Sequence, residues 1–220
     1  VALEPFHPTF QFWLAVLVYF AIVSMTGMIR VALPISLRDI EHGANVAGVS
    51  GLAFTLGGLG AAFSVFVLGT RFFRSGQMRS GLVVFSLLTG AAQLLLAASH
   101  NVPSFVAVFA LISLLQAAMI PATNTLIAAN APRSRRGTAF GLASSAQAIA
   151  FIAGPSSAAF FTAISLQLGF AVLGAISVAL ALVLLVWLRE PPLAVFVASG
   201  SAGTFDEPSG DAVAAVRSPS

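Results

Sequence analysis

The sequence predicts an all-α membrane protein that folds as a bundle of six transmembrane helices. Hydrophobic residues make up 58% of the 220 residues and charged residues only 8%, whereas a soluble domain has roughly 45 to 50% apolar and about 25% charged residues. The mean hydropathy of +0.99 is correspondingly high. Apolar runs near the ~20 residues that cross about 30 Å of hydrocarbon recur six times along the chain. We therefore expect a lipid bilayer to surround most of the chain.

The first three spans are delimited by prolines, glycines and charged residues. The first covers about residues 12–33 and is expected to end where Pro34 and Asp39 follow. The second covers about residues 46–73, and the basic segment RFFRSGQMRS separates it from the third. The third covers about residues 81–98 and ends at the polar segment SHNVPS.

The last three spans carry no charged residue, although two of them contain a proline. The fourth covers about residues 105–129 and includes Pro121, and the fifth covers about residues 138–164 and includes Pro155. Membrane helices tolerate such prolines because neighbouring helices satisfy the freed backbone groups. The sixth covers about residues 170–188, after the short connection SLQLG.

Both ends of the chain differ in composition from the spans. Residues 1–11 are expected to form a cytoplasmic linker, and they lack the basic start of a signal peptide. Residues 189–220 are rich in Pro, Ser, Gly and acidic residues, so a disordered cytoplasmic tail is expected, because such a segment buries too little apolar surface to offset its ordering entropy. Since the chain begins with Val1 rather than methionine, we expect a fragment or a processed chain.

Arginine alone supplies the ten basic residues, and most arginines lie at the ends of apolar runs. Eight of them fall on one side of the predicted bundle: Arg71, Arg74, Arg79, Arg133, Arg135, Arg136, Arg189 and Arg217. The other side has only Arg30 and Arg38. Because positively charged loops stay in the cytoplasm, both termini are predicted to be cytoplasmic. This distribution also argues against a nucleic-acid partner, which would require basic residues gathered on one polar face.

No catalytic or metal centre is predicted. The chain has no cysteine, which removes disulfides, thiolate metal sites and cysteine nucleophiles. The segment GVSG at residues 48–51 is compatible with an intramembrane serine protease, but that chemistry needs a histidine base inside the membrane. His7, His42 and His100 all lie at or outside the span ends, so Ser50 has no base, and we expect neither an enzyme nor a cofactor.

Small residues recur at intervals of four in two spans. In the fifth span Gly137, Gly141 and Ser145 form one row, and Gly154 begins another; the second span contains the segment TLGGLGAAFS. Such rows let helix backbones approach closely, and this packing holds helices together in lipid. The predicted helix-packing or gating set is Gly57, Gly58, Pro121, Gly137, Gly141, Gly154 and Pro155.

The segment at residues 114–155, LLQAAMIPATNTLIAANAPRSRRGTAFGLASSAQAIAFIAGP, resembles a known family. It is similar to the tenth and eleventh helices of the major facilitator superfamily, in particular of its bacterial multidrug efflux members, which are drug:proton antiporters. The shared pattern is Pro-Ala-x-Asn, a basic loop, Gly-x-x-x-Gly, Ser-Ala-Gln and Gly-Pro. The matching residues are Pro121, Ala122, Asn124, Arg136, Gly137, Gly141, Ser145, Ala146, Gln147, Gly154 and Pro155.

The resemblance extends over about residues 10–190, so the six spans correspond to family helices seven to twelve. It implies one half of a major facilitator fold, with a preceding six-helix half in the same chain. It also implies a secondary transporter of the bacterial inner membrane that exports small amphipathic or drug-like compounds by alternating access, coupled to protons. No Asp or Glu lies within a predicted span, so the proton carrier is expected in the preceding half.

The candidate substrate pathway combines intramembrane polar residues with the helices that line the family's cavity, the seventh, eighth, tenth and eleventh. Gln116, Met119 and Thr123 share one face of the fourth span because they lie at i, i+3 and i+7. The predicted pathway set is Arg30, Gln116, Met119, Thr123, Asn124, Ser144, Gln147 and Phe151. The alternatives are hydrogen bonds between helices for the polar side chains and snorkelling to the outer interface for Arg30.

Two other functions stay open at this point. Major facilitator proteins with different substrates share the features of the fold, so the solute could equally be a sugar or an organic ion. A six-helix half that pairs with another half would also bury its small-residue faces without transporting anything. The second alternative is such a non-transporting membrane module, which packs against a partner half.

Overall fold

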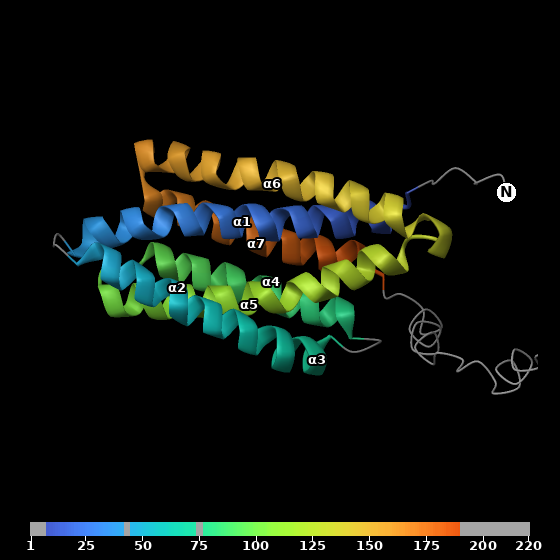
Figure 1. Ribbon diagram of the computed structural model, residues 1–220, viewed down its shortest axis with the longest axis horizontal. Coiled ribbons are helices and arrows are strands. Elements are labelled where there is room, and N and C mark those ends of the chain that lie inside the picture. The colour runs from blue at the N-terminus through green and yellow to red at the C-terminus, as the bar shows by residue number, and fades with distance from the viewer. Residues whose placement is uncertain (1–7, 42–44, 74–76, 190–220) are drawn as a thin grey trace, which may run out of the picture.

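The computed structural model describes residues 8–41, 45–73 and 77–189. Within these ranges six helices are long and apolar enough to cross a membrane, which confirms the predicted fold class. They form one bundle (Figure 1). In chain order the elements are α1 (Phe10–Glu41), α2 (Val46–Phe63), η1 (Ser64–Leu68), α3 (Gly69–Phe72), α4 (Met78–Ala97), α5 (Val102–Ala129), η2 (Arg133–Arg135), α6 (Arg136–Ile164) and α7 (Leu166–Trp187). The predicted tail after Arg189 lies outside the described residues.

The first helix continues through Pro34 and ends at Glu41, later than the sequence predicts. Proline removes one backbone donor, but the apolar packing does not stop there. Leu33 and Leu37, one turn apart on either side of the proline, are both fully buried. Burial of this face therefore holds the last turns of α1 in the helix despite the missing donor.

The second span changes its winding near its end. The backbone N–H of Gly69 donates to the carbonyl of Ser64, and η1 is a single stretch of π-helix between α2 and α3. π-Helical turns are rare and occur often at functional sites. Ser64 is fully buried at the start of this turn, so the irregular stretch contacts the bundle through this residue.

Side-chain caps set the start of two helices. The Asn101 side chain accepts a hydrogen bond of 2.9 Å from the backbone N–H of Ser104 at the start of α5. At the start of α7, Ser165 has an extended backbone and its hydroxyl accepts from the N–H of Leu168 at 3.3 Å. The connection between α6 and α7 is thus a single residue, and most of the segment expected to link these spans is the first turn of α7.

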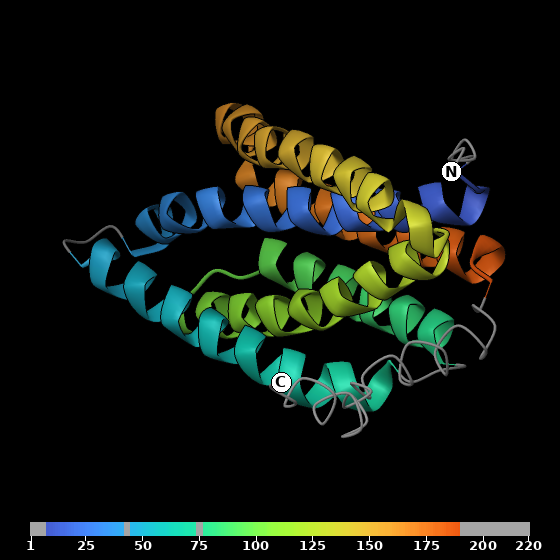
Figure 2. The ribbon, with the colours of Figure 1, turned by 45° about the vertical axis from the view of Figure 1, so that its right-hand side comes forward.

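The helices pack in three main pairs: α1 with α6, α2 with α5, and α4 with α7. Helices α1 and α5 also contact each other in the middle, whereas α2 and α6 lie at opposite edges of the bundle in both views (Figures 1 and 2). The six spans in order are α1, α2 with η1 and α3, α4, α5, α6 and α7. Exchanging the first span with the fourth, the second with the fifth and the third with the sixth turns the α1–α6 pair into the α5–α2 pair and leaves the α4–α7 pair unchanged. Spans three apart run in opposite directions, so the two triplets are related as an inverted repeat.

Glycines permit the closest helix crossings. A Cβ atom added to Gly154 on α6 would lie 2.5 Å from the carbonyl oxygen of Ser24 and 3.0 Å from the Cα of Gly27, both on α1. Across the α4 and α7 pair, a Cβ on Gly90 would lie 3.0 Å from the carbonyl oxygen of Gly174. Backbone atoms cannot move aside as flexible side chains can, so any larger residue at these positions would separate the helices.

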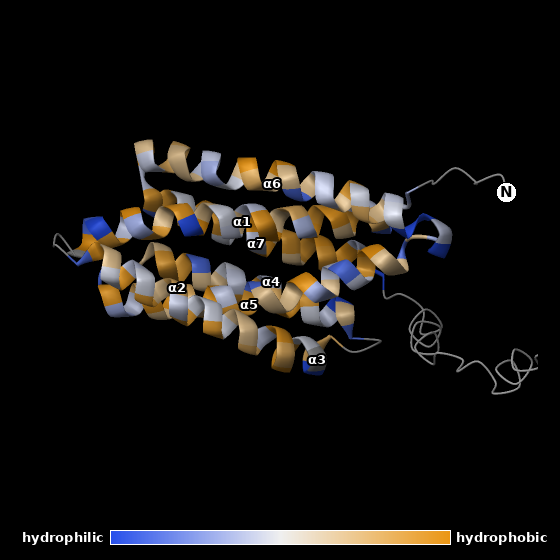
Figure 3. Ribbon diagram, in the orientation of Figure 1, coloured by the Kyte–Doolittle hydropathy of each residue, from blue (hydrophilic) through white to orange (hydrophobic). Residues whose placement is uncertain are grey.

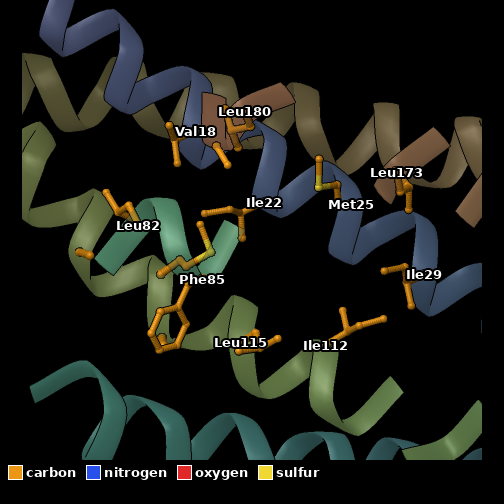
Figure 4. Packing of buried hydrophobic residues seen from close by; sticks show 14 of the residues in the cluster. Val18, Ile22, Met25, Ile29, Leu82, Phe85, Ile112, Leu115, Leu173 and Leu180 are labelled. Carbon is orange, nitrogen blue, oxygen red and sulfur yellow. The ribbon is translucent and has the colours of Figure 1, made fainter. Parts of the chain in front are cut away.

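Apolar side chains from α1, α4, α5 and α7 meet in the interior of the bundle (Figure 4). Val18, Ile22, Met25 and Ile29 mark one face of α1 at intervals of three and four residues, and all four are buried. This spacing matches one face of a helix. The interior face of α1 therefore follows from its sequence period.

Most strongly hydrophilic residues of the described chain lie near the two ends of the bundle, and apolar residues cover the bodies of the helices (Figure 3). At the end where α1 begins, the Gln11 amide donates to the carbonyl of Trp187 at 2.7 Å and accepts from the backbone N–H of Arg189 at 3.2 Å. Trp13 and Trp187 are about half exposed at this end, as is typical of tryptophans at a membrane interface. These contacts tie the start of α1 to the end of α7.

Candidate functional site

A pocket of about 490 Å³ lies between α1, α2 and α5. Thr26 and Arg30 line it from α1, Gly57 and Gly58 from α2, and Gln116 from α5. These residues lie in the middle part of their helices, as the bounds of the three elements show. The pocket therefore lies near the middle of the three spans.

A polar contact in the wall of the pocket joins two helices. The Thr26 hydroxyl lies 2.8 Å from the Gln116 amide oxygen and 2.8 Å from the carbonyl oxygen of Ile22. Gln116 is 5% exposed and its amide nitrogen has no hydrogen-bond partner among the described residues. The amide oxygen and nitrogen of Gln116 can be exchanged in the assignment. In either assignment one of these two atoms contacts the Thr26 hydroxyl and the other has no partner. A buried polar atom in this state favours a ligand that satisfies it.

Aromatic and glycine residues form the remaining wall. Phe54 on α2 and Phe109 on α5 meet edge to face, with ring centroids 5.9 Å apart. A Cβ on Gly57 would lie 2.8 Å from the Phe109 ring, so this glycine lets α2 approach α5. Gly58 faces open space, with nothing within 4 Å of an added Cβ. The pocket thus combines apolar surface with a few polar groups, as small-molecule sites generally do.

Of the four predicted pathway residues on α5, one lines the pocket and three do not. Gln116 lines the pocket, whereas Met119 and Thr123 are buried and do not line it, and neither does the half-buried Asn124. The Thr123 hydroxyl is 3.0 Å from the carbonyl oxygen of Met119 and 2.9 Å from that of Ile120, both in its own helix. Its polarity is therefore satisfied locally rather than by another helix.

The predicted residues of α6 do not reach this pocket. Ser144 and Phe151 are exposed and Gln147 is half-buried, and α6 packs on α1 rather than on α2. Of the predicted pathway set, the structure brings only Arg30 and Gln116 into one cavity.

Sequence reasoning missed Thr26, Ser113 and Phe109, which also line the pocket. The spacing carries a usable signal, because Thr26 and Arg30 are one turn apart and so are Ser113 and Gln116. What the spacing cannot supply is that these two polar faces meet, since this depends on how α1 packs against α5.

The predicted helix-packing residues also behave differently from one another. Gly154 lies in the tight crossing with α1. Beside it, the Cδ atom of the exposed Pro155 would lie 3.4 Å from a Cβ atom added to Gly27. Gly137 and Gly141 face open space within the described chain. Their role in packing stays a prediction. Pro121 lies inside α5, where its carbonyl accepts from the Thr125 hydroxyl at 2.9 Å.

The basic residues of the predicted cytoplasmic side lie at one end of the bundle. Arg71 is in α3, Arg79 is in the first turn of α4, and Arg133, Arg135 and Arg136 are in η2 and the start of α6. The Arg79 guanidinium donates to the carbonyl of Leu185 on α7, so this residue also ties helices together. Arg74 lies outside the described residues.

The sequence model of the Major Facilitator Superfamily matches residues 15–217, nearly the whole chain. The chain belongs to the major facilitator superfamily. No curated protein sequence matches it. Each six-helix half of a major facilitator protein contains an inverted repeat of three helices, and the paired contacts of α1 with α6, α2 with α5, and α4 with α7 have this symmetry.

The mid-span pocket fits membership in a transporter family. The alternative, an intramembrane serine protease with Ser50 as its nucleophile, would need a histidine beside this serine. Ser50 is buried, and its hydroxyl makes no hydrogen bond within the described chain. His100 lines a different pocket, while His7 and His42 lie outside the described residues. No base adjoins this serine in the part of the chain that the structure describes.

That second pocket, of about 500 Å³, lies where α1 ends and α5 and α7 begin. Ser36, Asp39 and His100 line it together with Gln167. It belongs to the opposite end of the bundle from the arginine-rich loops. Substrate sites of major facilitator proteins lie near the bilayer midplane, so the pocket between α1, α2 and α5 is the better candidate.

A buried polar contact between α4 and α7 has a structural character instead. The Ser177 hydroxyl lies 2.7 Å from the Gln93 amide oxygen and 3.3 Å from the Met25 sulfur. All three residues are buried, and none lines either pocket. In a major facilitator half such a contact joins helices, which in membranes contributes about 0.6 kcal/mol on average.

Proposed function

We propose that this chain is the C-terminal half of a secondary active transporter that exports small amphipathic or drug-like compounds by alternating access coupled to protons. The observation that carries the proposal is the mid-span pocket of about 490 Å³ in a chain of a transporter family. Its walls combine the Arg30 guanidinium and the Gln116 amide with the rings of Phe54 and Phe109. Amphipathic molecules match this combination, because one part can pack on the rings while another satisfies the polar groups.

We propose that a preceding six-helix half covers the face bordered by α2 and α6. Only 17% of the most apolar stretch is buried in the spans that contain α2 and α6, against 44 to 56% in the other four. Gly137 and Gly141 on α6 have open space around them. Contact with lipid requires no small residues, whereas close contact with another helix does, so this face supports a helical partner.

We propose that the arginine-rich end of the bundle faces the cytoplasm of a bacterial inner membrane. Arg71 and Arg133 are exposed at this end, and positively charged loops are retained in the cytoplasm. In this orientation both ends of the six-helix unit, the start of α1 and the end of α7, are cytoplasmic.

We assign the proton carrier to the preceding half. Among the residues whose side chains the structure describes, the only carboxylate is Asp39, which is exposed near the end of α1. Proton coupling needs a titratable group that exchanges access together with the substrate site. Asp39 is poorly placed for this because the substrate pocket lies at mid-span.

Expression of the intact protein in a drug-sensitive bacterial host that lacks its main efflux pumps tests the proposal. We expect higher resistance to amphipathic drugs and faster efflux of a fluorescent dye than in the same host with an empty vector. Collapse of the proton gradient with a protonophore should remove the difference in efflux. The proposed function fails if expressed, membrane-inserted protein changes neither resistance nor efflux.

A further inference from the structure

The pocket between α1, α2 and α5 has a positive formal charge and no negative one. Arg30 lines it and is exposed, and no Asp or Glu is among the described residues of its wall. No hydrogen bond or ion pair joins Arg30 to another described residue. Arg30 lies roughly three turns before the end of α1, and an unpaired charge inside a membrane is costly. A bound anion would remove this cost.

A second polar group of the pocket can donate to the same anion. With the Gln116 amide oxygen on the Thr26 hydroxyl at 2.8 Å, the buried amide nitrogen has no hydrogen-bond partner in the described chain. The proposal takes this assignment, in which the nitrogen is the atom left to donate. A carboxylate, sulfonate or phosphate group accepts from both an amide and a guanidinium, and it can accept two parallel bonds from the guanidinium.

The apolar wall limits what else the ligand carries. Phe54 and Phe109 present their rings to the pocket, beside Ile112 and the glycine pair of α2. A small hydrated anion would leave this surface without a partner. An apolar or aromatic body would cover it and exclude water from the charged groups, which strengthens their interaction.

We propose that this pocket selects organic anions with an apolar or aromatic body, with the acidic group on Arg30 and Gln116 and the body on Phe54 and Phe109. The inference rests on the proposed function, since it names the substrate class of the same pocket. It narrows that class, because a cationic amphipathic compound would meet Arg30 with like charge, and no carboxylate among the described residues of the pocket wall offsets that charge.

Binding to the intact protein, purified in detergent, tests the charge preference without requiring transport. The probe is tritiated naphthalene-1-acetate, measured by scintillation proximity. The competitors are naphthalene-1-acetamide and 1-naphthylmethylammonium, which keep the aromatic body but are neutral and cationic. We expect the carboxylate to bind at least about tenfold more tightly than either, which is the effect of one hydrogen bond to a charged group.

Substitution of the guanidinium supplies the matched comparison. Arg30→Gln should weaken carboxylate binding by about tenfold and leave binding of the ammonium compound unchanged or tighter, while Arg30→Lys should retain part of the preference. Arg38→Gln is the control, since Arg38 is exposed on the same helix and does not line the pocket. If Arg30→Gln does not give a monodisperse protein, the comparison of the three ligands on the native protein and on Arg30→Lys decides.

Several results would overturn the inference. These are equal or tighter binding of the ammonium compound, no displaceable carboxylate binding, equal losses in Arg30→Gln and Arg38→Gln, or displacement of the carboxylate by phosphatidylglycerol, which would assign the site to a lipid headgroup. Anion-selective binding without efflux in cells would reject the proposed function and keep this inference. Efflux of cationic dyes that is unaffected by Arg30→Gln would keep the proposed function and reject this inference.

Discussion

Replacing Gly154 with alanine is expected to destabilise the protein by about 1 to 3 kcal/mol, the usual range for overpacking. The added methyl group would lie 2.5 Å from the carbonyl oxygen of Ser24 and 3.0 Å from the Cα of Gly27. These are backbone atoms of α1, so relief requires the two helices to separate. The higher helix propensity of alanine, worth up to about 1 kcal/mol, does not compensate for the loss of this crossing.

The measurement is the thermal unfolding temperature of the intact protein in detergent, together with the fraction that remains monodisperse. The control is Gly51→Ala on α2, where an added Cβ also meets nothing within 4 Å. We expect Gly154→Ala to lower the unfolding temperature clearly and Gly51→Ala to leave it unchanged or slightly raised. Equal unfolding temperatures for the two variants would contradict the described packing of α1 on α6.

Replacing Gly58 with phenylalanine is expected to reduce transport at least about tenfold, a barrier change of about 1.4 kcal/mol, with little effect on folding. Gly58 lines the pocket between α1, α2 and α5, and an added Cβ there meets nothing within 4 Å. A phenyl ring can therefore be accommodated without separating helices, and it occupies space that substrate would use.

The efflux rate per amount of membrane-inserted protein is the quantity to compare. Gly51→Phe is the control, because Gly51 is also exposed on α2, also has nothing within 4 Å of an added Cβ, and does not line the pocket. The two glycines are seven residues apart and so share a helix face. Similar efflux from both variants would mean that substrate does not use this pocket.

The number of membrane-length helices could be predicted from the sequence because each span is a local property. An apolar run of membrane length and the arginines at its end require no knowledge of the neighbours, and six such helices are found. The end of α1 could not be predicted in this way. A local rule stops the helix at Pro34, but the burial of Leu37 against the bundle continues it.

The candidate pocket was predicted only in part for the same reason. The period of α5 singled out Gln116, and a charged side chain toward the outer end of an apolar span singled out Arg30. That Thr26 contacts Gln116 and that Phe109 faces Phe54 depend on packing between helices far apart in the chain. The small-residue rows had the same limit, since the sequence alone does not distinguish Gly137 in open space from glycines in close contact.

The proposed function requires that the middle of the bundle between α1, α2 and α5 is a substrate site open to water rather than packed or lipid-filled space. The 220 residues contain no cysteine, so a Ser113→Cys variant of the intact protein, with any cysteine of the preceding half replaced by serine, reports on the pocket that Ser113 lines. Leu88→Cys serves as the control, since Leu88 lies in the middle of α4 and is 49% exposed on the outer surface of the bundle.

The measurement is the rate of modification of each intact variant in membranes by a charged, membrane-impermeant methanethiosulfonate. We predict that the Ser113→Cys variant reacts and the Leu88→Cys variant does not, because only a thiol in contact with water can ionise and meet the reagent. If the Ser113→Cys variant is as unreactive as the Leu88→Cys variant, the pocket is closed to water and the proposed substrate site is wrong.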